Sequence, residues 1–281
     1  KQNGRFIFKG NLIDGKLDGQ CETYHVGGNL KYKGEMKDNK YDGQGILYYI
    51  NCNVGYGGEF KNGKYHGKGK LYFDNGQLQY DGRFENGKFH GQGKQYDIYG
   101  RLKYEGEFEK DNFEGQGKYY HDYEEMMEGY FVNNYLEGQG KRYYKTGELK
   151  YEGRFKRDRY HGQWKMYFEN GDLKYEWGFR DNKFHGQGKL YENGDLKYEG
   201  GFENGMYNGQ GKLYENGILV FEGEFENGNR CEAKLLYKIE NVDGFIEGVI
   251  DNKHTGLYER INTKTGKTIF KGMLTDDKLN G

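Results

Sequence analysis

Histidines recur at one position of an internal repeat, and they are the first residues that could do chemistry. They are His66, His90, His161 and His185, each followed by glycine. A metal ion needs ligand atoms about 2.0–2.1 Å from itself, whereas equivalent positions of adjacent β-hairpins lie about 10 Å apart. The spacing therefore excludes a metal shared along this row and predicts a structural role on a polar face.

Nucleophiles are scarce, which argues against covalent catalysis. The chain contains no serine, so a serine nucleophile is excluded. The chain has three cysteines, Cys21, Cys52 and Cys231, and this odd number fits a reducing compartment better than a disulfide framework. No repeated base lies near them, which argues against a thiol enzyme. Gly-x-Gly segments resemble phosphate-binding loops, but no helix is predicted after them. We therefore predict no catalytic residue, no metal and no cofactor.

Composition narrows the class of protein further. The 281 residues include 49 Gly, 29 Tyr, 18 Phe and no Pro, and 31% are charged. That is too polar for one large buried core and too aromatic for a disordered chain. The net charge of -1 leaves no electrostatic footprint for nucleic acid or an acidic membrane surface. No apolar run could span a bilayer, and a chain that stops within a motif suggests a piece of something longer.

An aromatic-x-Gly-x-aromatic pattern recurs every 23–25 residues and defines about twelve units. We call its first residue the anchor. The anchors are Tyr32, Tyr56, Tyr80, Tyr104, Tyr151, Tyr198 and Phe221, with degenerate copies at Phe8, Met127, Tyr175, Ile246 and Phe270. A Gly-x-Gly segment follows most of the regular anchors. We predict a regular array over residues 1–230 and a degenerate continuation of the same array over 231–281.

Asn-Gly dipeptides between alternating runs predict β-hairpins and their register. Folding the chain about Asn86-Gly87 gives the pairs Phe84–Phe89, Gly82–Gly91 and Tyr80–Gly93. Folding it about Asn75-Gly76 gives the pairs Gly69–Gly82, Leu71–Tyr80 and Gly67–Phe84. Rings from one strand would then lie flat on the bare glycine backbone of its neighbour.

Opposite charges meet on the other face in seven consecutive units, which supports this register because a slip by one residue would lose every pair. The pairs are Lys70–Asp81, Lys94–Glu105, Lys118–Glu128, Lys141–Glu152, Lys165–Glu176, Lys189–Glu199 and Lys212–Glu222. We predict an all-β fold: an elongated, single-layer, twisted antiparallel meander with one hairpin per repeat. One face would be aromatic, and the other a lattice of Lys, Glu, Gln and His in water.

Tryptophans break the pattern at one place. Trp164 replaces the second glycine of a Gly-x-Gly, Trp177 replaces the glycine of the next anchor pattern, and a turn at Asn170-Gly171 would pair them across strands. The pair could fill a dip in an aromatic groove, or it could contact a partner, since Trp is enriched at binding hot spots. The candidate partner-binding residues are Trp164, Trp177, Tyr151, Phe155, Tyr175, Phe179, Phe184 and Tyr198. Met127, in place of tyrosine, is interpreted as drift.

The segments YEGRFKRDRYHGQWKMYFENG and YEGEFEKDNFEGQGKYY resemble the MORN repeat, and the resemblance covers nearly the whole chain. Phenylalanines such as Phe84 and Phe155 stand where the family often has tryptophan. Units containing NGDLKYEG are similar to a variant found in bacterial repeat proteins, some of them described as antitoxins. The resemblance implies an elongated twisted sheet that serves in axonemal, cytoskeletal or membrane-junction assemblies, or beside lipid-kinase or methyltransferase domains.

We therefore expect a non-catalytic scaffold for protein–protein interaction, in the cytoplasm and within a cytoskeletal or ciliary (axonemal) assembly. An aromatic face should not be able to bury itself in a single-layer sheet, so its groove would bind a partner peptide, a helix or a second MORN array. A bacterial antitoxin-like protein, a peripheral membrane tether and a fragment of a multidomain enzyme stay open. Charges that alternate in sign give little support for binding membrane lipid, and none for nucleic acid.

Overall fold

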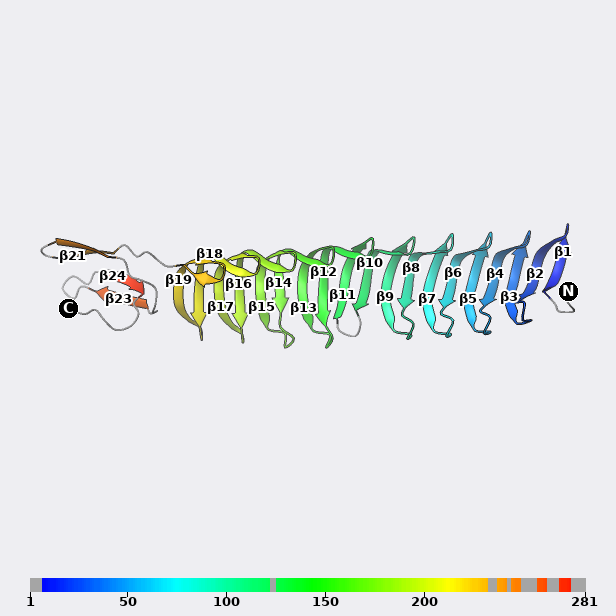
Figure 1. The fold of residues 1–281 in the computed structure, drawn as a ribbon, viewed down its shortest axis with the longest axis horizontal. Coiled ribbons are helices and arrows are strands. Elements are labelled where there is room, and N and C mark those ends of the chain that lie inside the picture. The colour runs from blue at the N-terminus through cyan, green and yellow to red at the C-terminus, as the bar shows by residue number, and fades with distance from the viewer. Residues whose placement is uncertain are drawn as a thin grey trace. The chain divides into compact units, whose positions relative to one another are not determined.

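The computed structural model describes residues 7–121, 125–231, 237–241, 244–248, 257–261 and 268–273, with side chains up to residue 231. The elements assigned in these ranges are strands (Figure 1). In the described part of the chain, no helix has the length and apolar character needed to cross a bilayer.

Twenty strands form one sheet. They are β1 (Phe8–Ile13), β2 (Lys16–Tyr24), β3 (Leu30–Lys37), β4 (Lys40–Tyr48), β5 (Val54–Lys61), β6 (Lys64–Tyr72), β7 (Leu78–Glu85), β8 (Lys88–Tyr96), β9 (Leu102–Glu109), β10 (Asn112–His121), β11 (Glu125–Val132), β12 (Tyr135–Tyr144), β13 (Leu149–Lys156), β14 (Arg159–Tyr167), β15 (Leu173–Arg180), β16 (Lys183–Glu192), β17 (Asp195–Glu203), β18 (Met206–Glu215), β19 (Ile218–Glu226) and β20 (Asn229–Arg230). Two separate hairpins follow, β21 (Tyr237–Asn241) with β22 (Gly244–Gly248), and β23 (Leu257–Ile261) with β24 (Thr268–Met273).

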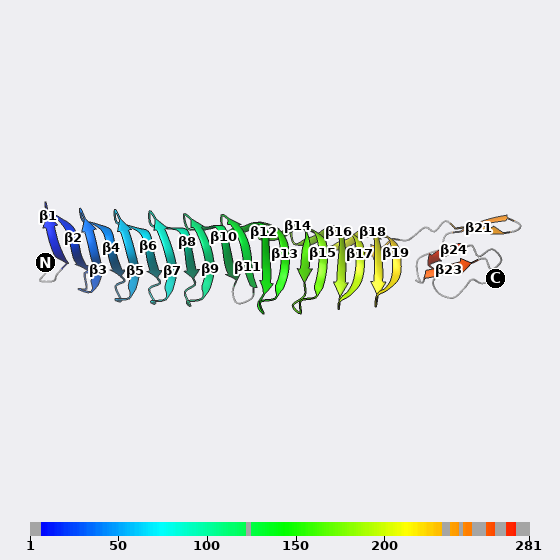
Figure 2. The same cartoon turned by 180° about the vertical axis from the view of Figure 1, so that it is seen from behind.

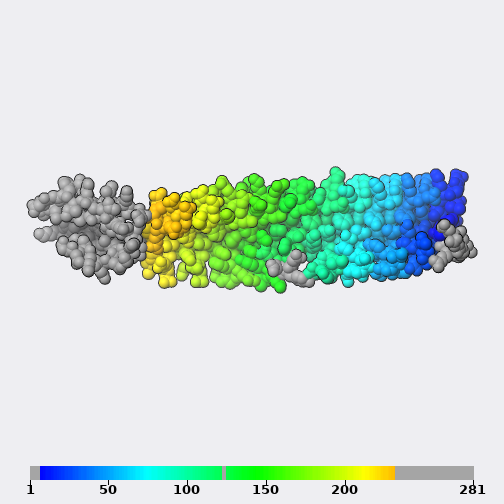
Figure 3. Space-filling view, viewed as in Figure 1, coloured from blue at the N-terminus to red at the C-terminus, as the bar shows by residue number. Residues whose placement is uncertain are grey.

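Neighbouring strands in sequence are neighbours in the sheet, as Figures 1 and 2 show from opposite sides. The pairing is antiparallel throughout, for example β6 with β7 and β7 with β8. The colours of the space-filling view accordingly follow one another in chain order along each unit (Figure 3). The predicted all-β, single-layer antiparallel meander with one hairpin per repeat is confirmed.

Contacts divide the chain into two compact units. The first is Lys1–Leu149 with Phe155–Asp158, and the second is Lys150–Arg154 with Arg159–Gly281. The side chains on which the predicted degenerate segment 231–281 depends lie almost entirely outside the described residues, as do those of the anchors Ile246 and Phe270. The predicted boundary at residue 230 therefore stays a prediction.

The two kinds of Asn-Gly turn differ in backbone conformation. Asn86 and Gly87 have positive φ values of 53° and 85°, as a tight two-residue hairpin turn requires. At Asn75-Gly76 the glycine takes the positive φ, 86°, while the backbone N–H of Phe73 donates to the carbonyl of Gln77 at 2.8 Å. The second link is therefore a longer loop than the tight turn.

The register predicted about Asn75-Gly76 is confirmed, and the register predicted about Asn86-Gly87 is only partly right. Phe84 does face Phe89, but Gly82 faces Gly93 rather than Gly91, and Tyr80 faces Gln95. The difference is a bulge of two residues in β8 that begins at Gly91. Gly91 adopts a φ of 61°, which a residue with a Cβ rarely tolerates.

The same bulge recurs along the array at the first glycine of each Gly-x-Gly, and at Gly19 and Gly162, where Cys21 and Trp164 replace the second glycine. The φ values lie between 56° and 93° at Gly19, Gly43, Gly67, Gly91, Gly115, Gly138, Gly162, Gly186 and Gly209. The two glycines thus have different roles: the first permits the bulge, and the second lies beneath a tyrosine ring.

The bulge also aligns the charges on one face of the sheet, which we call the charged face. Asp81 lies opposite Lys70 on one side and Lys94 on the other. The row in the first unit runs Lys70, Asp81, Lys94, Glu105, Lys118, Glu128 and Lys141. The row in the second unit runs Lys165, Glu176, Lys189, Glu199, Lys212 and Glu222. The predicted Lys141–Glu152 pair, whose members fall in different units, stays a prediction.

Several members of these rows are in ion-pair contact. The Lys94 Nζ atom lies 2.9 Å from Glu105 Oε1, and Lys70 Nζ lies 3.2 Å from Asp81 Oδ2. Tyrosines also lie on this face: Tyr191 donates to Glu176 at 2.9 Å. The expectation of a face without aromatics was therefore wrong.

Stacked rings form the core on the opposite face, the aromatic face. Tyr80 is fully buried and stacks on Phe89 at 3.8 Å between ring centroids, with an interplanar angle of 6°. Its edge meets Phe84 at 5.0 Å and Phe108 of the next repeat at 5.1 Å. A Cβ placed on Gly93 would lie 2.3 Å from the Tyr80 hydroxyl, so the ring occupies the space that glycine leaves open.

This core is closed by its own repeats. The anchors Tyr32, Tyr56, Tyr80, Tyr104, Tyr151, Tyr175 and Tyr198 are all 0% exposed. The expectation that an aromatic face in a single-layer sheet could not bury itself was wrong for these rings. Each one lies on glycine backbone and is covered by aromatic side chains of its own repeat and the next.

Candidate partner-binding surface

The predicted partner-binding rings form a connected cluster in the second unit. Tyr175 stacks on Phe184 at 3.9 Å and meets Phe179 edge-on at 4.9 Å. Phe179 also meets the Tyr151 ring at 5.3 Å. Tyr198 joins the cluster through Phe202, which contacts the rings of both Tyr175 and Tyr198. The structure thus brings five of the eight predicted residues into one aromatic network.

Burial separates these rings from the tryptophans. Tyr151, Tyr175 and Tyr198 are 0% exposed, Phe155 and Phe179 are also buried, and Phe184 is half-buried. Phe155 belongs to the first unit, while the others belong to the second. The rings of the second unit therefore support the surface from within. A direct role for them in binding stays a prediction.

The tryptophans are the exposed members of the predicted set. Trp164 and Trp177 are direct cross-strand partners between β14 and β15, as predicted. Their exposed fractions are 37% and 48%. The Cγ of Trp164 lies 2.3 Å from the position that a Cβ of Gly153 would take, so Gly153 must remain glycine beside it.

Trp177 has an unusual backbone conformation. Its φ is 106°, in a region that side chains disfavour. Gly106 and Gly200 stand at the same repeat position with a φ of 158°. A Cβ on Gly200 would lie 2.5 Å from the Cα of Gly211, so the register leaves little room for any side chain here. Trp177 is accommodated by a shift of the backbone.

Burial keeps the anchor phenols protonated. It raises the pKa of Tyr198 to about 12 and raises that of Tyr175 further. Both hydroxyls donate to backbone carbonyls at 3.0 Å, Tyr175 to Gly178 and Tyr198 to Gly201. At neutral pH these tyrosines therefore act as fixed hydrogen-bond donors within the fold.

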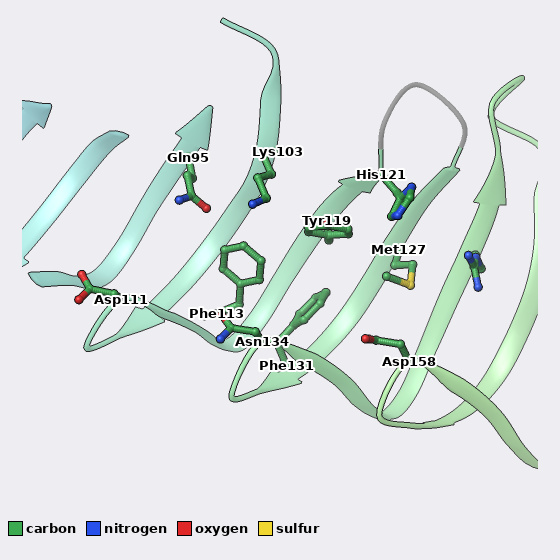
Figure 4. A pocket seen from close by; sticks show the side chains of 11 residues that line it. Gln95, Lys103, Asp111, Phe113, Tyr119, His121, Met127, Phe131, Asn134 and Asp158 are labelled. Atoms are coloured by element: carbon green, nitrogen blue, oxygen red, sulfur yellow. Dashed lines mark hydrogen bonds between the residues drawn. The ribbon is translucent and has the colours of Figure 1, made fainter. Parts of the chain in front are cut away.

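A hollow on the aromatic face of the first unit was missed by sequence reasoning. Its volume is about 650 Å³, and it lies around Met127 (Figure 4). Met127 replaces the anchor tyrosine, and Leu136 stands where the stacked aromatic of other repeats lies. Two rings are thereby lost, which leaves space beside Phe113 and Phe131.

A second feature of the sequence marks the same place. One position of the repeat is leucine in four repeats, each time paired with an anchor aromatic. The four are Leu47, Leu71, Leu190 and Leu213. The same position holds Gln95, Tyr119 and Arg142 around the hollow. Three consecutive departures from leucine were a signal, but Met127 alone was interpreted as drift.

Two of the four repeated histidines, His66 and His90, lie beside carboxylates. The His90 ring lies between two carboxylates, with Nε2 3.4 Å from Glu85 and Nδ1 3.0 Å from Glu109. His66 pairs across strands with Glu59. Within the described ranges, no three His, Cys, Asp or Glu side chains are grouped so that they could hold a metal ion.

Comparison with known families identifies the repeat. The family model described as MORN repeat matches residues 32–51, 56–78, 80–97, 104–123, 178–196 and 198–218. The model described as MORN repeat variant matches residues 136–157 and 160–181. Together the two models match eight repeats and cover more than half of the chain. No curated protein matches the sequence.

Proposed function

The chain belongs to the MORN-repeat family, and we propose that it is a non-catalytic scaffold that binds another protein through the Trp164–Trp177 pair. The repeats make it a repeat scaffold of a kind that often binds proteins or membranes. The finer assignment, a protein partner held at the two tryptophans, rests on the local geometry of β14 and β15.

The observation that carries the proposal is the exposed Trp177 at a φ of 106°. A glycine at this position would avoid backbone strain, which costs about 1–3 kcal/mol per residue in such regions. Two large rings left 37% and 48% exposed also leave apolar surface in water. Binding of a partner is the gain that would offset both costs, since Trp is enriched among the hot-spot residues of protein interfaces.

The chain contains two tryptophans, so its intrinsic Trp fluorescence reports on this one site. We expect a photo-crosslinking amino acid in place of Trp177 to capture the partner from lysate of the source cells. The captured protein, purified and titrated into the full chain, should then shift Trp emission to shorter wavelength as the rings lose water.

The decisive variant is the double substitution Trp164→Gly with Trp177→Gly, which restores the glycines of the repeat. It should weaken binding of the purified partner about 30-fold or more, the equivalent of a 2 kcal/mol hot spot. Tyr130→Gly is the matched control, because Tyr130 is 47% exposed on β11 of the other unit. Unchanged affinity of the double variant would show that the tryptophans are not the binding site.

We further propose that the partner belongs to a cytoskeletal or ciliary assembly in the cytoplasm, as membership of the family suggests. Fractionation of cells that express the tagged full chain tests this placement. Recovery with the detergent-insoluble cytoskeleton or axoneme would support it, and recovery only in the soluble fraction would contradict it.

A further inference from the structure

We propose that the hollow around Met127 is a binding pocket for a small organic anion, a carboxylate carried on an aromatic body. The proposal concerns the first unit and is independent of the tryptophan site. It rests on the space left by two missing rings, on the polar residues that replace leucine, and on Lys103, which has no ion-pair partner among the described side chains.

The space arises because one repeat lacks its stacked pair. In the neighbouring repeat Tyr104 stacks on Phe113 at 3.9 Å and fills the gap above Gly117. Met127 and Leu136 take the equivalent places, although the underlying Gly129 and Gly140 remain. Aliphatic chains fill less of this space than two stacked rings. The resulting volume of about 650 Å³ is within the usual range for small-molecule pockets.

The wall combines an apolar floor with polar groups above it. Phe113, Phe131 and Met127 form the floor, and Tyr119 lies beside them. Gln95 and Lys103 come from the neighbouring strands β8 and β9, and Figure 4 shows both on the same side of the sheet as the Phe113 ring. Such a wall suits a ligand with a ring at one end and a polar group at the other.

The carboxylates of the wall are already used by the fold. Asp158 accepts a hydrogen bond from the backbone N–H of Leu136 at 2.6 Å. Asp111 accepts one from the N–H of Phe89 at 2.8 Å and also lies 3.6 Å from Lys88 Nζ. Both carboxylates thus already accept a hydrogen bond from the backbone, and the charge of Asp111 is also paired with Lys88.

The two cations of the wall, Arg142 and Lys103, differ in their partners. Arg142 forms an ion pair with Glu125. Lys103 is exposed and forms no ion pair with any side chain that the structure describes. The carboxylate of such a ligand would accept a charge-assisted hydrogen bond from Lys103, and the aromatic ring of the ligand would lie over Phe113. An ammonium group at the same place would meet the like charge of Lys103, so this end of the pocket should favour an anion.

Methyl NMR of the full chain tests the pocket with a matched pair of probes. With ¹³C-methyl methionine, we expect 3-phenylpropionate to shift the Met127 methyl signal in a saturable manner. Phenethylamine, which has the opposite charge on a similar skeleton, should bind at least tenfold more weakly. Equal affinity for the two probes, or no saturable Met127 shift with the carboxylate, would overturn the proposal.

Three variants separate pocket binding from general adsorption. Lys103→Ala should weaken 3-phenylpropionate binding at least tenfold, while Lys31→Ala, at the same position of an earlier repeat, should leave it unchanged. Met127→Tyr with Leu136→Phe restores the stacked pair, so it should fill the hollow and abolish binding while the chain stays folded by circular dichroism. Binding that survives in Lys103→Ala or in the filled variant would contradict the assignment.

Discussion

Tyr80 and Phe89 stack face to face, although in the strand register Tyr80 is paired with Gln95. The ring leans along its strand over Gly82 and Gly93, and its hydroxyl donates to the carbonyl of Arg83 at 3.0 Å. The stacked pair is therefore fixed by bare backbone beneath it as much as by the ring beside it.

Gly93→Ala tests this dependence on glycine. The new Cβ would lie 2.3 Å from the Tyr80 hydroxyl, so the buried ring must move. We expect a loss of about 1–3 kcal/mol in the free energy of unfolding, the usual cost of overpacking, measured by urea unfolding followed by circular dichroism. Gly57→Ala is the control, because nothing lies within 4 Å of a Cβ there. Equal losses for the two variants would rule out the ring contact as the cause.

Trp177→Gly and Trp177→Ala should invert the usual order of stability in a strand. Both variants lose the indole, but alanine keeps the strain of a φ of 106°. We expect the glycine variant to be more stable by about 1–3 kcal/mol, seen as a higher Tm. At Trp164 we expect the ordinary order, with alanine at least as stable as glycine. A more stable alanine variant at 177 would mean that the backbone there is unstrained.

Gly63→Asn should stabilise the first unit by joining successive tight turns. Asn134 occupies the same turn position, and its Oδ1 accepts a hydrogen bond from the N–H of Phe113 at 2.8 Å. The backbone N–H of Gly63 donates to the carbonyl of Tyr41 at 2.8 Å, but Gly63 has no side chain that could accept a hydrogen bond in return. A gain of about 0.5–1.5 kcal/mol is expected from urea unfolding. Gly63→Ala, which cannot accept, should show no gain.

Asp158→Asn should stabilise the chain at neutral pH. Burial raises the pKa of Asp158, so its contribution to stability is fully present only at acidic pH, below the pKa in the unfolded chain. That contribution is lost as pH rises through the folded-state pKa. Asparagine keeps the acceptor for Leu136 without the charge. The Tm advantage of the variant should be largest near neutral pH and disappear in acid.

Asp38→Asn is the control with the opposite sign. The hydrogen bond from Lys16, 2.9 Å long, lowers the pKa of Asp38, so its contribution is present above the unfolded-state pKa and is lost in acid. This variant should therefore lose stability at neutral pH. The same pH dependence in both variants would contradict the assignment for Asp158.

Lys94→Glu should destabilise the charged face in a salt-dependent way. Lys94 lies between Asp81 and Glu105 in the register, so the substitution creates two like-charge neighbours. Because each cross-strand pair is worth about 0.2–1 kcal/mol, a loss of about 0.5–2 kcal/mol is expected. Raising the salt concentration should reduce the Tm difference. Lys94→Gln, which removes the charge without reversing it, should lose less stability. A loss of stability in Lys94→Glu that does not depend on salt would point to packing as the cause.

The sequence was a good guide wherever the signal is local. The Asn-Gly turns, the Tyr and Phe rows, and the Trp164–Trp177 pair were all predicted, because hairpin turns and a period of two fix which residues share a face. The charge pairs such as Lys70–Asp81 were predicted for the same reason.

The bulge was not predicted, because Gly91 and Gly93 lie two residues apart. The register with the bulge and the register without it therefore both place a glycine opposite Gly82. Only charge separates the two registers: Asp81 would face Gln92 without the bulge and faces Lys94 with it. Testing both hairpins for charge pairs would have favoured the observed register.

The hollow could not be read from one repeat either. Its walls come from several strands and from turns such as the one at Asp158, which a period of 24 residues does not bring together. A substitution such as Met127 shows a loss of volume, but whether neighbours fill that volume depends on their side chains in space.

Within each unit, the ladder hydrogen bonds run from hairpin to hairpin, along the direction in which the repeats succeed one another. A force that pulls the first repeat of a unit away from its last repeat would therefore act on the few hydrogen bonds of one strand pair at a time. Such an array would lengthen under tension in steps of one repeat, and each released segment could refold on its neighbour when the tension falls.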